Sequence, residues 1–334
     1  MTLHWAARPM DLTVVIPTRD RAAVLREHLA RLERQAGEAE FEVVVVDDGS
    51  SDDTVAVVEA AAERSPHRLT LLQQAGRGAA AARNRALAVA RAPVCLFVND
   101  DTLPRPGLVE RHAGFHARRP EPEDALLGRV ELAAHPPPTP FMRWLAGVHF
   151  DQDVDDPRDA GGRRFFTSNV SVKLDLVRRA GGFDEAFPAA GHEDIDLGLR
   201  LERLGLRLAR DPDAVVEHCH PLDLAGAIRR FRATAPSLVL FSERHPDWPP
   251  PTRPAMRHRV KAGGLAALTA AGLARGPLRR ETWRFLCDEA TREGYWEAAH
   301  GTTRRGPEPA DGVRIGRTLA RLAARDPDAQ LPAA

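Results

Sequence analysis

The feature that most constrains the fold is a regular alternation of short apolar segments with helical ones in the first hundred residues. The apolar segments are rich in β-branched residues and are expected to be strands, at 12–16, 41–46, 69–73 and 94–98. Helices are expected between them, at 22–35, 52–64 and 79–91. Strands that are apolar on both faces and separated by helices predict a mainly parallel sheet flanked by helices. The expected fold class is therefore α/β.

The rest of the chain is less regular and ends in a helical part. Further strands are expected at 125–132, 167–173 and 214–218, and further helices at 108–119, 174–180 and 193–204. The chain is helical in character from Leu224, with a proline-rich interruption at 245–251. We therefore expect one domain over 1–250 and a helical C-terminal appendage over 251–334.

Composition excludes several classes of protein. Lys and Arg together number 47, as do Asp and Glu, so no basic excess points to nucleic acid as a partner. The hydrophobic share of 43% is enough for a core and excludes a disordered chain. The cysteines Cys95, Cys219 and Cys287 are far apart and form no CxxC pattern, which favours a reducing compartment. With no signal-peptide pattern at the start, we expect a cytoplasmic protein.

Pairs of carboxylates follow two of the expected strands. Asp47 and Asp48 come after the second strand, and Asp100 and Asp101 come after the fourth. Ligands of such sheets bind beyond the carboxyl ends of the strands, where both pairs would lie. Mg²⁺ or Mn²⁺ is commonly held there by one or two carboxylates together with phosphate oxygens of the substrate. The pattern predicts a metal-bound diphosphate, with an ordinary Asp-Gly turn as the alternative for 47–50.

An ordered set of motifs resembles glycosyltransferase family 2 and its GT-A fold. The motifs are 14–21 (VVIPTRDR), 45–54 (VVDDGSSDDT), 76–87 with Ala82-Arg83-Asn84, 97–102 (FVNDDT), 181–185 (GGFDE) and 191–197 (GHEDIDL). The resemblance implies an inverting transfer of a sugar from a nucleotide-sugar, UDP-linked by default, to an acceptor hydroxyl on a carbohydrate, a lipid-linked molecule or a small molecule. It also implies a nucleotide-binding half at 1–101 and an acceptor half at 102–250.

The resemblance assigns roles on the donor side residue by residue. The residues implied to bind the nucleotide-sugar are Pro17, Arg19, Asp47, Asp48, Arg83 and Asp100. Asp101 is implied to bind the metal, Mg²⁺ or Mn²⁺. The family's acidic triplet often begins with Asp, whereas Asn99 stands there in this chain. For Arg83 the alternative is a solvated charge on a helix surface.

Glu193 and Asp194 are the candidates on the acceptor side. Direct displacement at an anomeric carbon needs a base opposite the leaving nucleotide, and an Asp at a helix start can supply one. The helix N-terminus is expected to favour the charged carboxylate. By analogy with the family, Asp194 is the expected base and Glu193 the expected acceptor-binding neighbour. The alternative for Asp194 is helix capping.

His218 follows the last expected strand and is the second candidate metal ligand. The family often has a metal-contacting His after such a strand, and His218 matches better than His220. The alternative is a hydrogen-bonded histidine at the surface. A zinc site with Cys219 is not expected, because adjacent residues cannot supply a tetrahedral set.

The segment 253–284 carries eight Lys or Arg residues and one acidic residue. It is a candidate for peripheral contact with an anionic membrane surface or a lipid-linked acceptor, and the alternative is a packed helix with a solvated basic face. Two other functions stay open: a sugar-nucleotide or glycan-binding module without catalysis, and a sugar-phosphate nucleotidyltransferase. Sugar-phosphate nucleotidyltransferases resemble one another in a Gly-rich loop after the first strand. In this chain Pro17 to Arg21 follow that strand and include no Gly, which argues against this function. No GxGxxG motif follows an early strand, which argues against a dinucleotide-dependent oxidoreductase.

Overall fold

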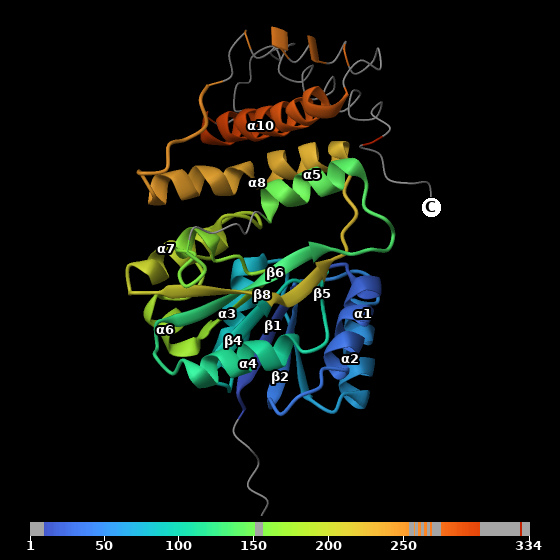
Figure 1. Ribbon diagram of the computed structural model, residues 1–334, viewed down its shortest axis with the longest axis vertical. Coiled ribbons are helices and arrows are strands. Elements are labelled where there is room, and N and C mark those ends of the chain that lie inside the picture. The colour runs from blue at the N-terminus through green and yellow to red at the C-terminus, as the bar shows by residue number, and fades with distance from the viewer. Residues whose placement is uncertain are drawn as a thin grey trace, which may run out of the picture. The chain divides into compact units, whose positions relative to one another are not determined.

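The computed structural model describes residues 10–150, 156–253 and 275–300, with the single positions 257, 260, 261, 264, 265, 268 and 328 (Figure 1). The chain divides into two compact units. The sheet unit comprises Met1–Leu132, Gln152–Ala186 and Glu193–Cys219, and the helical unit comprises Ala133–Asp151, Phe187–His192 and His220–Ala334. These units do not coincide with the expected domain boundary between residues 250 and 251. That boundary stays a prediction.

The sheet unit is built on an eight-stranded sheet in the order β3-β2-β1-β4-β7-β6-β8-β5. The strands are β1 (Leu12–Thr18), β2 (Phe41–Asp47), β3 (Arg68–Gln73), β4 (Val94–Val98), β5 (Thr102–Pro104), β6 (Asp124–Leu132), β7 (Asn169–Lys173) and β8 (Arg207–His218). The pairs β1–β2, β2–β3, β1–β4 and β6–β8 are parallel. The pairs β4–β7, β6–β7 and β5–β8 are antiparallel. The expected α/β class is confirmed, with a mixed sheet.

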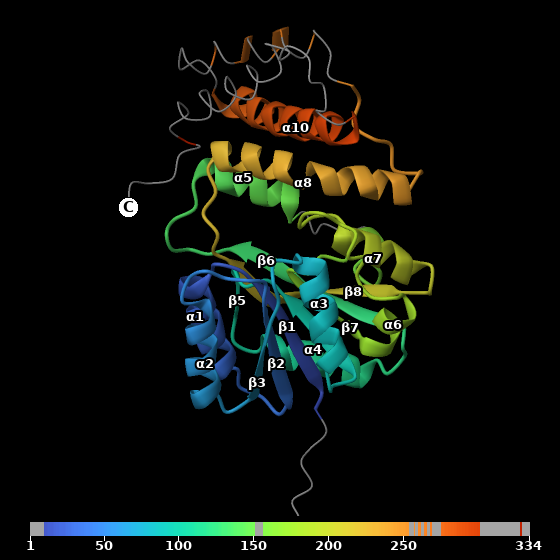
Figure 2. The ribbon, with the colours of Figure 1, turned by 180° about the vertical axis from the view of Figure 1, so that it is seen from behind.

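Helices cover both faces of this sheet because of the order in which the strands are visited. The helices α1 (Ala22–Glu33) and α2 (Thr54–Arg64) connect β1 to β2 and β2 to β3, in one direction along the sheet. The helix α3 (Ala79–Val89) leads back from β3 to β4, so right-handed crossovers put it on the opposite face. The helix α4 (Leu108–Arg118) lies in front of the sheet in Figure 1, whereas α3 lies in front in Figure 2.

One core of the sheet unit lies under α3. Its small residues Ala82 and Ala86 pack with Val15 and Val44 of the two central strands. Phe97 of β4 has its ring centroid 5.4 Å from that of Phe183. This core also takes in α6 (Leu174–Arg179), α7 (Glu193–Glu202) and the segment before β7, where the 3-10 helix η1 (Gly162–Arg164) lies. It holds α3 and α7, which carry Arg83 and Asp194, on one side of the sheet.

The helical unit contains α5 (Pro140–His149), α8 (Leu224–Arg244) and α10 (Gly276–His300). Phe141 of α5 packs edge-on against Trp283 of α10, with ring centroids 5.4 Å apart. Arg232 of α8 pairs with Glu293 of α10 at 2.7 Å. Among the described residues, no helix is both long enough and apolar enough to cross a membrane.

Candidate active site

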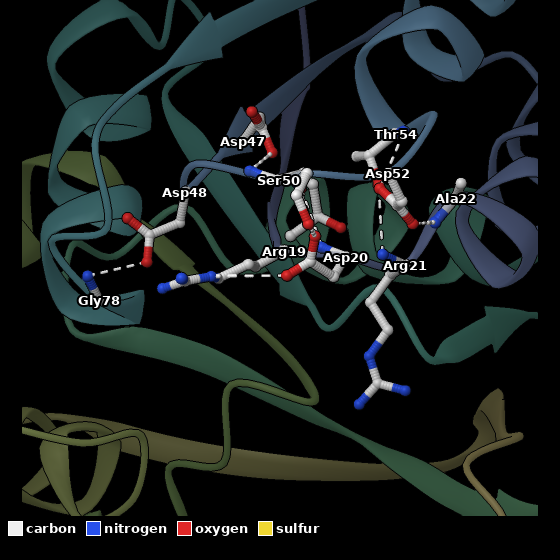
Figure 3. A network of polar contacts seen from close by, with 12 residues as sticks. Arg19, Asp20, Arg21, Ala22, Asp47, Asp48, Ser50, Asp52, Thr54 and Gly78 are labelled. Atoms are coloured by element: carbon white, nitrogen blue, oxygen red, sulfur yellow. Dashed lines mark hydrogen bonds and ion pairs between the residues drawn. The ribbon is translucent and has the colours of Figure 1, made fainter.

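Asp48, directly after β2, organises the loop that leads into α3. One of its carboxylate oxygens accepts hydrogen bonds from the Gln74 side-chain amide at 2.8 Å and from the Arg77 backbone N–H at 2.7 Å. The other oxygen accepts from the backbone N–H of Gly78 at 2.9 Å, as Figure 3 shows. Asp48 is 8% exposed. A buried carboxylate with three such donors fixes the conformation of the 74–78 loop.

Asp47, next to Asp48, contacts a different segment, the turn directly after β2. Its Oδ1 accepts a hydrogen bond from the backbone N–H of Ser50 at 3.1 Å, which closes a turn after β2. Gly49 in that turn has a φ of +79°, and an added Cβ would lie 3.2 Å from the backbone nitrogen of Gly76. The turn and the 74–78 loop are therefore in close contact.

The loop after β1 is tied to the loop after β2 (Figure 3). Asp20 has a φ of 50°, and its Oδ1 accepts from the backbone N–H of Ser51 at 2.7 Å. Asp52 accepts in return from the backbone N–H of Ala22 at 3.0 Å. Pro17 is half-buried at the end of β1, and Arg19 is exposed, with its Nε 3.7 Å from Asp20. The Arg19 side chain is thus largely exposed to solvent.

Asp100 lies at the end of β4 and bonds to the end of β1. Its Oδ2 accepts a hydrogen bond from the Thr18 hydroxyl at 2.8 Å. Burial, together with the charge of Asp101, raises the pKa of Asp100 to about 6, although the Thr18 bond acts in the opposite direction. Thr18 was not among the predicted site residues, although it directly follows Pro17 at the end of an expected strand.

The antiparallel pairing of β5 with β8 brings Asp101 and His218 together. Thr102 lies opposite His218, and the backbone N–H of Cys219 donates to the Asp101 carbonyl at 2.9 Å. As a result, His218 Nε2 lies 3.7 Å from Asp101 Oδ2, with each side chain 13% exposed. The two expected metal ligands are therefore neighbours in space.

These two side chains fit a divalent cation. Two bonds of about 2.1 Å from one ion can span donors that are 3.7 Å apart. Within the described ranges, no group of three or more His, Cys, Asp or Glu residues could form a closed metal site. A cation held by Asp101 and His218 would therefore keep most of its coordination positions for oxygens from substrate or water.

Arg83 on α3 is buried, so the alternative of a solvated helix charge is wrong. Its guanidinium bonds to Glu193 at 2.9 Å through Nη1 and to the Asn99 side-chain oxygen at 3.2 Å through Nη2. The Arg83 and Glu193 side chains are each 5% exposed. The Phe183 ring lies against the guanidinium, with its centroid 5.4 Å from Cζ. Arg83 thus joins the start of α7 to the residue before Asp100.

Asp194 is the second residue of α7 and is half-buried. Burial raises its pKa above the usual range for an aspartate, and the negative charge of Glu193 raises it further. The charge of Arg83 and backbone N–H donors act in the opposite direction; one of these, the N–H of Ile195, lies 2.9 Å from Oδ1. The expected stabilisation of the charged form at the helix start is therefore outweighed. A raised pKa suits a carboxylate that accepts a proton near neutral pH.

The N-terminal half of α3 connects the three carboxylate positions. Gly78, just before α3, donates to Asp48. Arg83, one turn into α3, binds both Glu193 and Asn99. Asp48, the Asp100-Asp101 turn and the start of α7 are therefore linked through one short stretch of helix.

Comparisons with known proteins point to one family. Residues 13–130 match the family model described as glycosyl transferase family 2. Over 266 residues the chain is 32% identical to a validoxylamine A glucosyltransferase from Streptomyces hygroscopicus subsp. jinggangensis, with 71% of this chain and 61% of that protein covered. It is also 32% identical to a pre-mycofactocin glycosyltransferase from Mycobacterium tuberculosis, with 71% and 48% covered. The chain thus spans about half to three fifths of the length of these relatives.

Solved structures share the fold. The mannosyltransferase PcManGT from Pyrobaculum calidifontis, solved with GDP-Man and Mn²⁺, superposes with a TM-score of 0.53 at 22% identity, covering 97% of this chain and 88% of that one. Residues 1–349 of TarS from S. aureus superpose with a TM-score of 0.52 at 18% identity, covering 89% and 93%. These likenesses establish the GT-A type of fold. The family model and the relatives show that this chain belongs to glycosyltransferase family 2.

Proposed function

We propose that this chain transfers a sugar from a nucleoside-diphosphate sugar to an acceptor hydroxyl, with inversion at the anomeric carbon. The observation that carries the proposal is the link from Asp194 through Glu193 and Arg83 to the turn that holds Asp100 and Asp101. It ties a carboxylate with a raised pKa to a pair of residues suited to a cation. A base on one side and a diphosphate-binding position on the other are what single displacement requires.

On the donor side, the nucleotide would lie against the loops after β1 and β2. Asp48 fixes the 74–78 loop and has lone-pair capacity left for a base or ribose. Asp47, Pro17 and Arg19 would complete this pocket, with the exposed Arg19 available to an anionic group. Asp100 would contact the ribose or the sugar. Arg83 would support this side indirectly, through its hydrogen bond to Asn99, the residue before Asp100.

Asp101 and His218 would hold the divalent ion, Mg²⁺ or Mn²⁺. When bound, the ion supplies charge neutralisation for the departing diphosphate. Mg²⁺ prefers oxygen ligands, so the imidazole of His218 favours Mn²⁺ of the two. The Mn²⁺ in the PcManGT structure supports the use of such an ion.

On the acceptor side, Asp194 would accept the proton of the acceptor hydroxyl while the hydroxyl oxygen attacks the anomeric carbon. The bond from that carbon to the diphosphate oxygen breaks in the same step, and the diphosphate takes the bonding electrons. Glu193 would bind the acceptor beside it. A positioned base of this kind contributes about 10² to 10⁴ in rate.

The donor and acceptor follow from the family only in class. UDP-sugars are the default, and structures with the same fold have been solved in complex with UDP-GlcNAc and with GDP-Man. The acceptor would be a carbohydrate, a lipid-linked molecule or a small molecule, as the name of the validoxylamine A relative illustrates for a small one.

A nucleotide-sugar panel tests the proposal. Each donor is added with Mn²⁺, and both the melting temperature and the release of nucleoside diphosphate are measured, with and without acceptor sugars. We expect one donor to stabilise the chain and to release its diphosphate when acceptor is present. Stabilisation without release over the whole panel would favour the non-catalytic binding module. Pyrophosphate formed from a nucleoside triphosphate and a sugar phosphate would favour the nucleotidyltransferase.

A cytoplasmic location and peripheral membrane contact through 253–284 rest on the sequence. Much of that segment lies outside the described residues, and Lys261 within it pairs with Glu281 at 2.9 Å. Flotation of the protein with vesicles of anionic lipid would test the contact. If the contact exists, the protein should be recovered in the lipid fraction at low salt and not at high salt.

A further inference from the structure

We infer that Arg83 is a positioning residue: its guanidinium holds the base-bearing start of α7 at a fixed place relative to the cation-side turn after β4. The inference rests on the proposed function, because it assigns Arg83 a part in placing Asp194. It differs from the role that the family resemblance gives to Arg83, which is contact with the nucleotide.

The first argument is the geometry of the guanidinium. Arginine presents its N–H groups in a rigid plane, so two acceptors bound through Nη1 and Nη2 are kept at a set distance. One acceptor is Glu193, which precedes Asp194, and the other is Asn99, which precedes Asp100. A single rigid group therefore spans the two sides of the proposed reaction.

The second argument is that the guanidinium itself is held in place. Its third neighbour is the Phe183 ring, with the centroid 5.4 Å from Cζ. Phe183 is fixed in turn by Asn84, whose side chain accepts from the Phe183 N–H at 2.8 Å and donates to its carbonyl at 2.9 Å. An arginine that is 4% exposed and held on three sides cannot change rotamer without breaking these contacts.

The third argument is charge. Arg83 and Glu193 form a buried pair with no net charge, and the amide of Asn99 adds an acceptor without adding a charge. An Asp in place of Asn99 would add a second carboxylate that competes with Glu193 for the same guanidinium. Asn99 therefore leaves the positive charge to Glu193, which lies beside the proposed base.

The charges around Asp194 define what the experiment should see. Glu193 on α7 raises the pKa of Asp194, and Arg83 on α3 lowers it. The backbone N–H of Thr167 lies 3.5 Å from Asp194 Oδ2, and η1, which packs along α7, carries Arg163 and Arg164. The variants at Arg83 retain all of these groups. Loss of the Arg83 charge should therefore move the acid limb of the rate profile to higher pH.

The test compares Arg83→Lys, Arg83→Gln, the double variant Arg83→Gln with Glu193→Gln, and the control Arg85→Gln at an exposed position of the same helix. The readouts are kcat, the KM for the donor and the pH profile of kcat, together with melting temperature. Arg83→Lys keeps a charge for Glu193 but cannot bond to both acceptors in one plane, so it should keep most of the melting temperature and lose about 10²-fold in kcat.

The remaining variants separate position from charge. Arg83→Gln should lower the melting temperature, because it removes the buried guanidinium that balances the charge of Glu193, and should shift the acid limb to higher pH. The double variant should regain melting temperature without regaining kcat. Arg85→Gln should match the wild type in every readout.

Two results would overturn the inference. One is wild-type kcat and pH profile in Arg83→Lys. The other is a rise in donor KM at unchanged kcat, which would mean that Arg83 serves donor binding and not the placement of the base. Asp194→Asn, measured in parallel, keeps the two levels apart: if it transfers sugar at the wild-type rate, the proposed base is wrong, whereas an inactive Asp194→Asn with a fully active Arg83→Lys contradicts only the positioning role.

Discussion

At the scale of single residues, adjacent carboxylates have different partners and therefore different tasks. Asp47 accepts one backbone N–H and closes a turn, whereas Asp48 accepts three donors and shapes the 74–78 loop. The sequence indicates the pair and its place at the end of a strand. It does not indicate which acid binds which loop, because that depends on donors some 30 residues further along the chain.

This difference predicts unequal effects of matching substitutions. In Asp48→Asn an amide NH₂ would replace one of two accepting oxygens and face an N–H donor, so we expect a loss of about 1 to 3 kcal/mol in the free energy of unfolding and a higher donor KM. In Asp47→Asn one oxygen still accepts from Ser50, so a smaller loss is expected. Urea unfolding and donor kinetics of both variants provide the check, and equal losses would contradict the account.

The raised pKa of Asp194 predicts a pH dependence. The base must be ionised to accept a proton, so kcat should be full above its pKa and fall as the pH drops through it. Because burial and Glu193 raise that pKa, the fall should occur at a higher pH than for an ordinary aspartate. A kcat profile measured at saturating donor provides the check. A kcat that stays constant down to about pH 4, the usual aspartate range, would be incompatible with this assignment.

At the scale of elements, the parallel half of the sheet could be predicted and the other half only in part. The strands β1 to β4 are mostly apolar segments, and the structure confirms each of them within two residues. The strand β8 begins at Arg207, well before the expected 214. Its first half was not predicted because Asp211, Pro212 and Asp213 interrupt the apolar pattern. The strand β5 has only three residues, too few to show a periodic pattern. The sequence therefore did not predict the pairing of β5 with β8, which brings His218 to Asp101.

The helix α5 was also missed. No helix was expected there, because the proline-rich segment 135–140 that leads into it suggests only a break; that segment nevertheless ends in a helix start. Thr139 caps the helix by accepting from the Met142 N–H at 3.1 Å, and Pro140 occupies the first turn. Proline is favoured there, since the first N–H groups of a helix have no partner within it. Reading Thr-Pro as a cap would have found this helix.

The irregular pairing of β6 with β8 predicts a sensitive glycine. The register shifts between Leu127 and Arg129, and a Cβ on Gly128 would lie 2.5 Å from the Ala214 carbonyl oxygen. We expect Gly128→Ala to destabilise the chain by about 1 to 3 kcal/mol, because backbone must move. Gly147→Ala in α5 is the matched control, since nothing lies within 4 Å of its Cβ position. There, a gain of up to about 1 kcal/mol is expected. Denaturant unfolding of both variants decides, and a harmless Gly128→Ala would refute the prediction.

At the scale of the whole molecule, the candidate site belongs to the sheet unit alone. The three predicted carboxylate positions and His218 all fall within its segments. The sequence could indicate this grouping, because carboxyl ends of parallel strands share one edge of a sheet. It could not indicate the burial of Arg83, because an arginine in an alanine-rich helix has the same local pattern whether it is exposed or buried.

The central claim is that a cation-bound donor at Asp101 and a proton-accepting Asp194 serve one reaction. It is tested most directly by Mn²⁺-dependent donor binding, measured by calorimetry, and by sugar transfer in Asp101→Ala and Asp194→Asn side by side. The account predicts that Asp101→Ala loses the Mn²⁺-dependent part of donor binding. It also predicts that Asp194→Asn binds donor as the wild type does and loses about 10² to 10⁴ in transfer rate. Wild-type transfer by Asp194→Asn, or undiminished Mn²⁺-dependent binding by Asp101→Ala, would contradict it.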